Sequence, residues 1–249
     1  MKKQPLTDLE RLAVRRQPEG SPIMHQDWSS LLFMHWRIDE KLLRPLIPRH
    51  LSIDTFDGSA WIGITPFTIP TMRALPPFIP ALPGVSSMHE LNVRTYVYMD
   101  DVPGVWFFSL DASSSLAVMG ARMLYGLPYY NADISMDREE DTVDYSLTRT
   151  DEPTAEFDAV WTIGEELPYA HPGTLEFFLV ERYCLYAEKN GEIYSARIYH
   201  EPWPLREAVL SSLSSGMIES LGLPTPEGEP LLHFSEGVSV DIWPLAHAE

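Results

Sequence analysis

The sequence predicts an α+β fold, in which a curved, largely antiparallel β-sheet or barrel carries peripheral helices. Two turn signals support this class, because Asp57-Gly58 and Asn190-Gly191 each stand between stretches with strand character. Both dipeptides tolerate the positive φ angles of a tight hairpin turn. The expected flanking strands are 51–56 and 60–65 for the first hairpin, and 183–188 and 192–200 for the second.

The length of 249 residues, of which 45% are hydrophobic, suits one large domain. We expect this domain over 26–249, after an N-terminal extension over 1–25. Apolar residues recur at helical spacing over 6–16, with arginines among them. A targeting helix would have this pattern, but a helix that docks on the domain is the commoner case.

Local signals indicate the remaining elements. Asp39 is placed to cap a short helix through Leu43. The segment 66–89 is rich in proline yet apolar, so it should be an irregular loop; a lid over a pocket, a subunit contact and a plain surface loop all fit. Further strands are expected over 142–149 and 155–163, a hairpin turn over 139–141, and the last helix within 202–223.

The strand from Glu90 to Met99 alternates polar and apolar residues. One face would carry Glu90, Asn92, Arg94, Tyr96 and Tyr98, and the other Leu91, Val93, Thr95, Val97 and Met99. If the first face meets solvent, it is only the polar side of a strand. If the sheet closes on itself, that face lines a cavity, where Glu90 and Arg94 would hold opposite ends of a small ligand.

A helix is expected from Ser113–Ser115 to Tyr125, since Gly126 and Pro128 end it. The following strand begins with Tyr129 and Tyr130, and alternation allows at most one of these side chains to enter a cavity. Arg122 in the helix would either bind a ligand carboxylate or tie the helix to acidic groups of the domain.

Seven stretches, in order between Trp28 and Leu245, resemble the uncharacterised DUF2071 or YqjF-like family of the acetoacetate decarboxylase-like superfamily. They are Trp28-x-x-Leu-Leu-Phe-x-His-Trp36, Phe56-Asp-Gly-x-Ala-Trp-Ile-Gly-Ile64, Glu90-Leu-Asn-Val-Arg-Thr-Tyr-Val97, Gly104-Val-Trp-Phe-Phe-Ser-Leu-Asp-Ala112, Phe178-Leu-Val-Glu-Arg-Tyr-x-Leu-Tyr186, His200-Glu-Pro-Trp-Pro-Leu205 and His233-Phe-Ser-x-Gly-Val238. The resemblance implies the decarboxylase fold, but the family carries no established reaction, so function must be argued from the site.

The resemblance also implies a site without its usual nucleophile. Glu90 matches an active-site glutamate of the decarboxylases, whereas Tyr129 and Tyr130 stand where their adjacent lysines would be. The only lysines are Lys2, Lys3, Lys41 and Lys189. The last two are expected at exposed positions, whereas an imine-forming lysine needs a depressed pKa. We therefore expect no Schiff-base chemistry.

Composition and sequence motifs narrow the possible classes of function. A formal net charge of −18 argues against nucleic-acid binding. No apolar run is long enough to span a membrane, and the lone Cys184 suits a reducing cytoplasm. Nucleotide-binding and metal-binding motifs are missing from the sequence, so no cofactor and no metal are expected. A homo-oligomer is compatible with the sequence.

Two other polar groups each have a simplest structural interpretation. His35 lies in a stretch that is apolar on both faces, which favours a satisfied core histidine over a pocket acid or base. In Glu181-Arg182-Tyr183, a structural ion pair is the simplest interpretation.

Two classes of function follow. The first is a protein that binds a small carbonyl- or carboxylate-containing molecule in an internal cavity, through Asn92, Arg94, Arg122 and Tyr129 or Tyr130. The second is a lysine-independent lyase, hydratase or enolising enzyme, with Glu90 as acid or base and Arg94 or Arg122 stabilising an oxyanion. A structural role would need no polar cavity.

Overall fold

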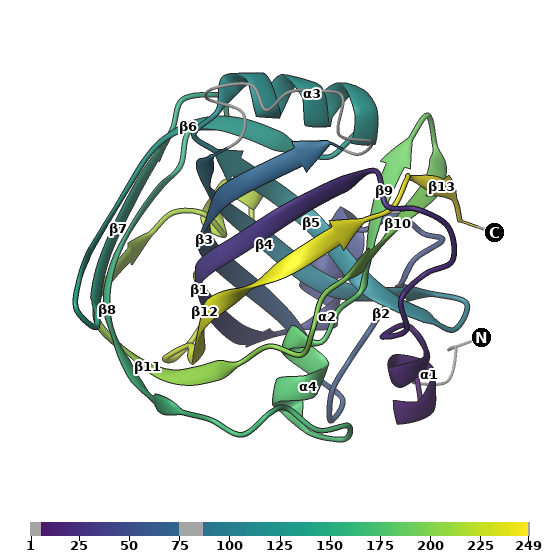
Figure 1. The fold of residues 1–249 in the computed structure, drawn as a ribbon, viewed down its shortest axis with the longest axis horizontal. Helices are drawn as coiled ribbons and strands as arrows, with labels where there is room; N and C mark the ends of the chain where they lie inside the picture. Colours follow the sequence, from purple (N-terminus) through teal and green to yellow (C-terminus); the bar gives the residue numbers. More distant parts are fainter. Residues whose placement is uncertain (1–5, 75–86, 249) are drawn as a thin grey trace.

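The computed structural model describes residues 6–74 and 87–248. Within these residues the strands join into one 13-stranded sheet with few helices, which confirms the expected curved, mainly antiparallel α+β fold (Figure 1). The strands are β1 (Met24–Ile38), β2 (Ser52–Ile53), β3 (Ala60–Ala74), β4 (Met88–Met99), β5 (Val102–Ala112), β6 (Tyr129–Glu139), β7 (Thr142–Arg149), β8 (Glu156–Glu166), β9 (Cys184–Lys189), β10 (Glu192–Tyr199), β11 (Leu205–Ser215), β12 (Leu231–Ile242) and β13 (Ala246–His247).

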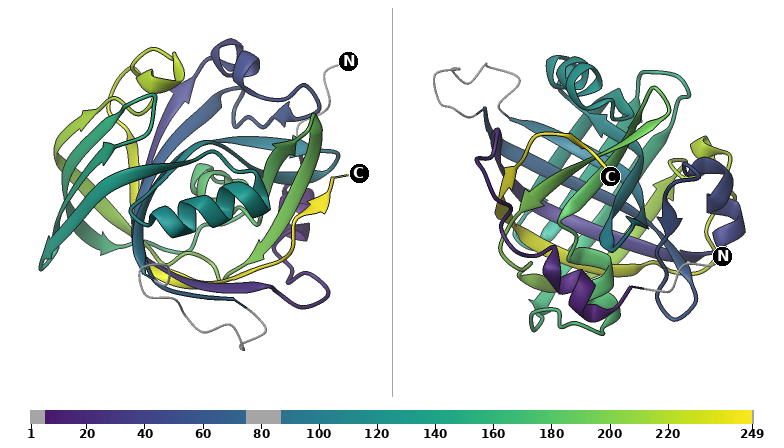
Figure 2. Two further views of the ribbon diagram at one scale, coloured as in Figure 1. Left: turned by 90° about the horizontal axis from the view of Figure 1, so that it is seen from above. Right: turned by 90° about the vertical axis from the view of Figure 1, so that its right-hand side faces the viewer.

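Short helices lie at the edges of this sheet (Figures 1 and 2). They are α1 (Asp8–Ala13), α2 (Glu40–Leu43), α3 (Ser115–Tyr125), α4 (Leu175–Val180) and the 3₁₀ turns η1 (Arg44–Leu46) and η2 (Glu219–Leu221). The helix α3 has the predicted ends, with Ser114 as N-cap and Gly126 in the left-handed conformation at φ 64°. None of the helices in the described ranges has the length and apolar character needed to span a bilayer.

The sheet curls so that its strands are linked in two rings. The order β5-β6-β7-β8-β11-β12-β1-β3-β4 returns to β5 through the β4–β5 pairing. The order β9-β5-β4-β3-β1-β12-β10 returns to β9 through the pairings β10–β12 and β9–β10. The strands β12, β1, β3, β4 and β5 belong to both rings, so this shared wall has the first ring on one face and the second ring on the other.

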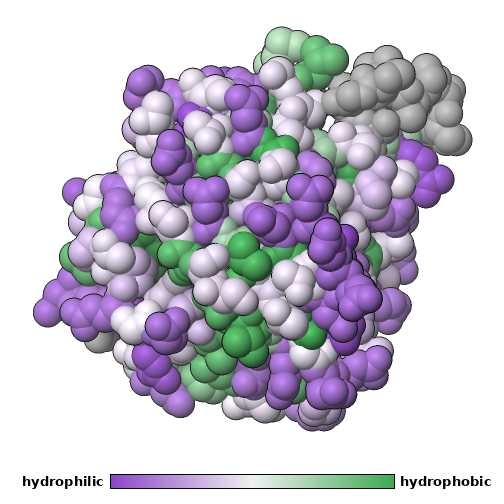
Figure 3. Space-filling model, turned by 90° about the vertical axis from the view of Figure 1, so that its left-hand side faces the viewer, coloured by the Kyte–Doolittle hydropathy of each residue, from purple (hydrophilic) through white to green (hydrophobic). Residues whose placement is uncertain are grey.

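The first ring is filled by side chains. Its aromatic centre is Tyr145, Phe157 and Trp161, each fully buried. Leu91 and Val93 of β4 pack into the same cluster, as expected for the apolar face of that strand. Close packing of this kind supplies most of the hydrophobic stabilisation. The outer face of β7 and β8, by contrast, is mostly hydrophilic, with a smaller hydrophobic patch near the middle of the view (Figure 3).

An irregularity in β1 shapes the shared wall. Ser30 has a φ of 52°, and the pairing of β1 with β3 is interrupted between Ser29 and Met34. Gly237 of β12 lies opposite Ser29, and a Cβ at Gly237 would stand 2.0 Å from the Trp28 carbonyl oxygen. Only glycine permits this close approach of the two strands.

Three sequence expectations are corrected. The segment 202–223 contains strand β11 rather than a helix, because β8 and β12 pair with its two sides. Asp57-Gly58 forms the expected positive-φ turn, but β2 pairs with β4 rather than with β3. Residues 66–74 continue β3 instead of starting a loop; Pro66 is tolerated because it lies where the β1 pairing is interrupted. The possible lid or subunit contact at 75–86 lies outside the described residues.

The N-terminal segment joins the domain through a buried ion pair. The helix α1 begins with a capping box between Thr7 and Glu10. Its Arg11 side chain is 9% exposed, and Arg11 Nη2 donates to Asp54 Oδ1 at 2.7 Å. A charge buried without a partner is costly, so this bidentate pair fixes α1 against the sheet.

Candidate functional site

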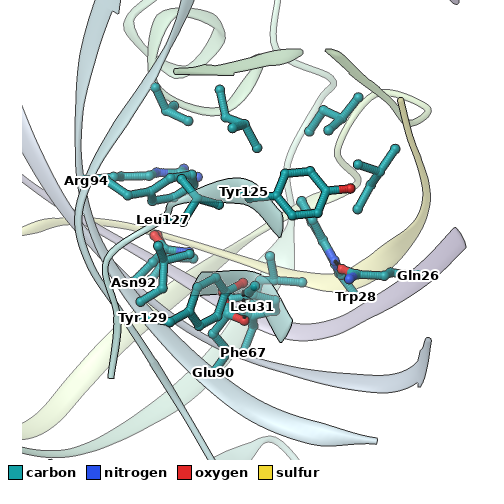
Figure 4. Close-up of a pocket in the computed structure, with 18 of the residues that line it drawn as sticks. Gln26, Trp28, Leu31, Phe67, Glu90, Asn92, Arg94, Tyr125, Leu127 and Tyr129 are labelled. Atoms are coloured by element: carbon teal, nitrogen blue, oxygen red, sulfur yellow. Dashed lines mark hydrogen bonds between the residues drawn. The ribbon is translucent and has the colours of Figure 1, made fainter. Parts of the chain in front are cut away.

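The second ring encloses a cavity of about 280 Å³ (Figure 4). Its wall is built from β1, β3, β4, β5, β9, β10 and β12, and α3 covers one side with Ala117, Gly120 and Ala121. The polar lining residues include Gln26, Thr65, Glu90, Asn92, Arg94, Tyr125, Tyr129, Arg182 and His200. Three residues of the polar face of β4, Glu90, Asn92 and Arg94, therefore line a cavity.

Glu90 lies at one end of this polar row. It is 3% exposed, and the Tyr129 hydroxyl donates to Glu90 Oε2 at 3.2 Å. The pKa of Glu90 is raised to about 8, mainly by burial. The hydrogen bond from Tyr129 acts in the opposite direction, and the nearby charge of Asp111 adds to the rise. Glu90 is thus mainly protonated at neutral pH and can itself donate a hydrogen bond.

Arg94 lies beyond Asn92 on the same face (Figure 4). Its guanidinium carbon is 5.5 Å from the centroid of Phe33, while its Nε and Nη2 atoms are buried without a hydrogen-bond partner. The Oδ1 atom of Asn92 is also buried and unpartnered. In the described part of the chain no carboxylate forms an ion pair with Arg94. Buried polar and charged atoms without a hydrogen-bond partner are rare in proteins, so these atoms of Arg94 and Asn92 call for a partner.

The two tyrosines at the start of β6 have different surroundings. Tyr129 lines the cavity, and burial, together with the neighbouring Glu90, raises its pKa well above the usual value. Tyr130 is not a lining residue; its ring lies 4.2 Å from the guanidinium carbon of Arg149. The alternation of a strand therefore separates the pair as expected.

Arg122 does not close the cavity, which corrects its assignment to the ligand site. It is exposed on α3, where its Nη2 donates to Asp151 Oδ2 at 2.6 Å and its Nε donates to the Tyr129 carbonyl oxygen at 2.7 Å. The side chain reaches away from α3 toward the loop before β8. Of the two sequence interpretations, the tie between helix and domain describes its contacts.

Sequence reasoning missed Arg182 as a lining residue. Arg182 is 5% exposed, its Nη1 donates to Asp54 Oδ2 at 2.8 Å, and its Nε donates to the Phe178 carbonyl oxygen at 2.7 Å. Its Nη2 is buried and unpartnered. The signal in the sequence was Arg182 itself, a charged residue in the mainly apolar stretch 178–186. The sequence does not reveal its partner, because Asp54 is far away along the chain.

Other titratable groups near the cavity are neutral. His35 Nε2 forms a hydrogen bond of 2.6 Å with the Tyr96 hydroxyl, and the tautomer of the ring decides which group donates. Burial lowers the pKa of His35 well below the usual value. Burial lowers the pKa of His200 to about 4 and raises that of Cys184 to about 12. None of the lining residues is a lysine. Within the described ranges no group of three or more His, Cys, Asp or Glu residues could hold a metal ion.

Comparisons with known proteins agree with this architecture. Residues 25–239 match the DUF2071 family, described as an uncharacterized conserved protein. The uncharacterized protein YqjF of Bacillus subtilis (strain 168) is 39% identical over 228 residues, which are 92% of this chain and 93% of that protein.

Solved structures share the fold at low identity. The enduracididine biosynthesis enzyme MppR, solved with a condensation product of pyruvate and imidazole 4-carboxaldehyde, has a TM-score of 0.67 at 12% identity, over 92% of this chain and 90% of that chain. An acetoacetate decarboxylase from Legionella pneumophila has a TM-score of 0.61 at 12% identity, over 100% and 98% of the two chains. These likenesses establish the acetoacetate decarboxylase-like fold, and the family match and the YqjF identity show that the chain belongs to the DUF2071 family.

Proposed function

We propose that this protein binds a small carbonyl- or carboxylate-containing molecule in the cavity of the second ring, without Schiff-base chemistry. One observation carries the proposal: Asn92 and Arg94 line the cavity and have buried polar atoms without hydrogen-bond partners. A buried polar group that lacks a hydrogen bond costs about 1–3 kcal/mol, and a charged group costs more. A ligand that supplies the missing partners removes this cost when it binds.

The polar groups suggest a role for each residue. The guanidinium of Arg94 suits a carboxylate, since its planar donors match two carboxylate oxygens. Protonated Glu90 suits a carbonyl oxygen, to which it can donate while its Oε2 accepts from the Tyr129 hydroxyl. Asn92 lies between them and offers both a donor and an acceptor. MppR, which shares the fold, has been solved with pyruvate, a molecule that has both groups.

Lysine placement supports the non-covalent part of the proposal. Lys41 is exposed on α2, and neither Lys41 nor Lys189 lines the cavity. An imine would need a lysine amine within reach of the bound carbonyl.

A second function is favoured by the pKa of about 8 at Glu90. A carboxyl group with this pKa inside a cavity is suited to proton transfer near neutral pH. The protein would then be a lyase, hydratase or enolising enzyme, with Glu90 moving the proton and Arg94 stabilising the oxyanion. Incubation with pyruvate in deuterium oxide distinguishes this from binding alone, because enolisation would exchange the methyl protons in the wild type and not in Glu90→Gln.

Native mass spectrometry of the purified protein, followed by pyruvate and acetoacetate titrations, tests the binding proposal. We expect a bound acid or keto acid, and a loss of about 2–5 kcal/mol in binding free energy for Arg94→Met. Arg138→Met is the matched control, because Arg138 pairs with Glu236 outside the cavity at 2.7 Å. If no carboxylate or carbonyl compound binds, or if Arg94→Met binds as tightly as the control, the proposal is wrong.

A further inference from the structure

A second arginine, Arg182, lines the cavity and does not belong to strand β4. Arg182 is held rigidly, since its guanidinium carbon lies 4.7 Å from the centroid of Tyr96 and 4.4 Å from that of Phe178. Two of its three nitrogens have partners, whereas Nη2 has none. Tyr96 follows Arg94 on the same face of β4, and Arg182 lies over the Tyr96 ring, so the two guanidinium groups lie near the same part of the cavity wall.

Positive charge exceeds negative charge in this region. Asp54 is shared between Arg11 and Arg182, so one carboxylate balances two arginines. Arg94 adds a third cation, and Arg15 stands 3.9 Å from Glu181 as a separate pair. Glu90 is mainly protonated at neutral pH, and His35 and His200 are neutral. The cavity therefore lacks negative charge, which an anionic ligand would supply.

The rest of the wall is apolar and aromatic. Trp203 lies 6.3 Å from Trp28 in a stacked arrangement and 5.1 Å from Phe33 in an edge contact. Phe67 packs edge-on against Trp28 at 5.7 Å. All four rings line the cavity. Aromatic walls also suit organic cations, but the unbalanced arginines would repel a cation, so these walls are matched to the apolar body of an acid.

The volume limits the ligand's size. An apolar cavity of about 150 Å³ holds benzene, which has six non-hydrogen atoms, so a cavity of about 280 Å³ suits a ligand of about ten non-hydrogen atoms. Pyruvate has six such atoms by its formula and would leave part of the cavity unfilled.

We infer, on the basis of the proposed function, that the ligand is an apolar carboxylic acid of about ten non-hydrogen atoms, and that Arg182 binds its carboxylate together with Arg94. Arg11 and Asp54 act as positioning residues. Because Arg11 contacts both Asp54 oxygens, Asp54 holds Arg182 only through Nη1 and leaves Nη2 without a protein partner.

Isothermal titration calorimetry with three probes separates the contributions. Phenylpyruvate has the carboxylate and an apolar ring, pyruvate has only the carboxylate and carbonyl, and phenylacetone has the ring and carbonyl without the carboxylate. We expect phenylpyruvate to bind at least about tenfold more tightly than either of the others, because each lacks one of the two recognised parts. If pyruvate binds as tightly as phenylpyruvate, this inference is overturned while the proposed function stands. If none of the three binds, both fail.

Two variants test Arg182 itself. Arg182→Lys keeps a positive charge beside Asp54 but removes the free Nη2 donor, so phenylpyruvate affinity should fall about tenfold or more while phenylacetone affinity is unchanged. Arg182→Met should show the same selective loss if it folds, which near-ultraviolet circular dichroism checks. Arg138→Met, outside the cavity, should bind all three probes like the wild type. An Arg182→Lys protein that binds phenylpyruvate like the wild type would refute the role of Arg182.

Discussion

Replacing Glu90 with Gln should make the protein more stable at neutral and alkaline pH. The folded state holds the Glu90 proton up to a pH of about 8, whereas the unfolded chain releases it near its usual pKa of 4.5. The protonated carboxyl therefore contributes stability that is fully present below pH 4.5 and is lost as the pH rises through 8. Gln keeps the shape and still accepts from Tyr129, but it does not titrate.

The size of this effect follows from the pKa shift. One pKa unit corresponds to about 1.4 kcal/mol, so the shift from 4.5 to about 8 corresponds to a free energy on the order of 5 kcal/mol. Between pH 5 and pH 7.5, the unfolding free energy of the wild type should fall relative to Glu90→Gln by about 1.4 kcal/mol per pH unit. Other titrating groups are common to both proteins and largely cancel in the difference.

Urea unfolding of both proteins at pH values from 5 to 8.5 measures this difference. Glu236→Gln serves as the control, because the hydrogen bond from Arg138 lowers the pKa of Glu236 and confines its effect to acidic pH. A difference between wild type and Glu90→Gln that stays constant with pH would refute the argument that Glu90 is buried and protonated.

Three more outcomes are expected. Incubation with acetoacetate and borohydride should leave the intact mass unchanged, and an adduct on Lys41 or Lys189 would contradict the argument from lysine placement. Asp54→Asn should lower the unfolding free energy in urea by about 3–5 kcal/mol, because it leaves its two arginine partners without a buried counter-charge. Arg122→Met should cost at most about 1 kcal/mol in the same assay, since its ion pair is exposed, and pyruvate affinity should not change; a loss of affinity would restore Arg122 to the site.

Local sequence patterns predicted the part of the cavity lining that lies on one strand. The alternation of β4 placed Glu90, Asn92 and Arg94 on one face, because successive side chains of a strand point to opposite faces. The same rule separated Tyr129 from Tyr130. Arg182 was missed because its position depends on Asp54, which is distant in sequence and brought near only by the closure of the second ring.

Strand β11 was missed for a related reason. Apolar residues at Leu205, Ala208 and Val209 fit a helical spacing, and short apolar runs are ambiguous between helix and strand. Pairing with β8 and β12 decides the conformation, and register shifts at 206–208 and 210–212 explain the irregular pattern. Tertiary hydrogen bonding therefore overrides the local preference.

The charge inside the cavity and the charge of the whole chain have opposite signs, and this separates the rate of ligand capture from its strength. An acid that approaches a molecule of net charge −18 meets a repulsive field before it reaches Arg94 and Arg182. Dissolved salt screens this field over about 10 Å at 0.1 M, whereas the buried arginines are screened much less. Association should therefore become faster as ionic strength rises, while dissociation, which depends on the contacts inside the cavity, should change little.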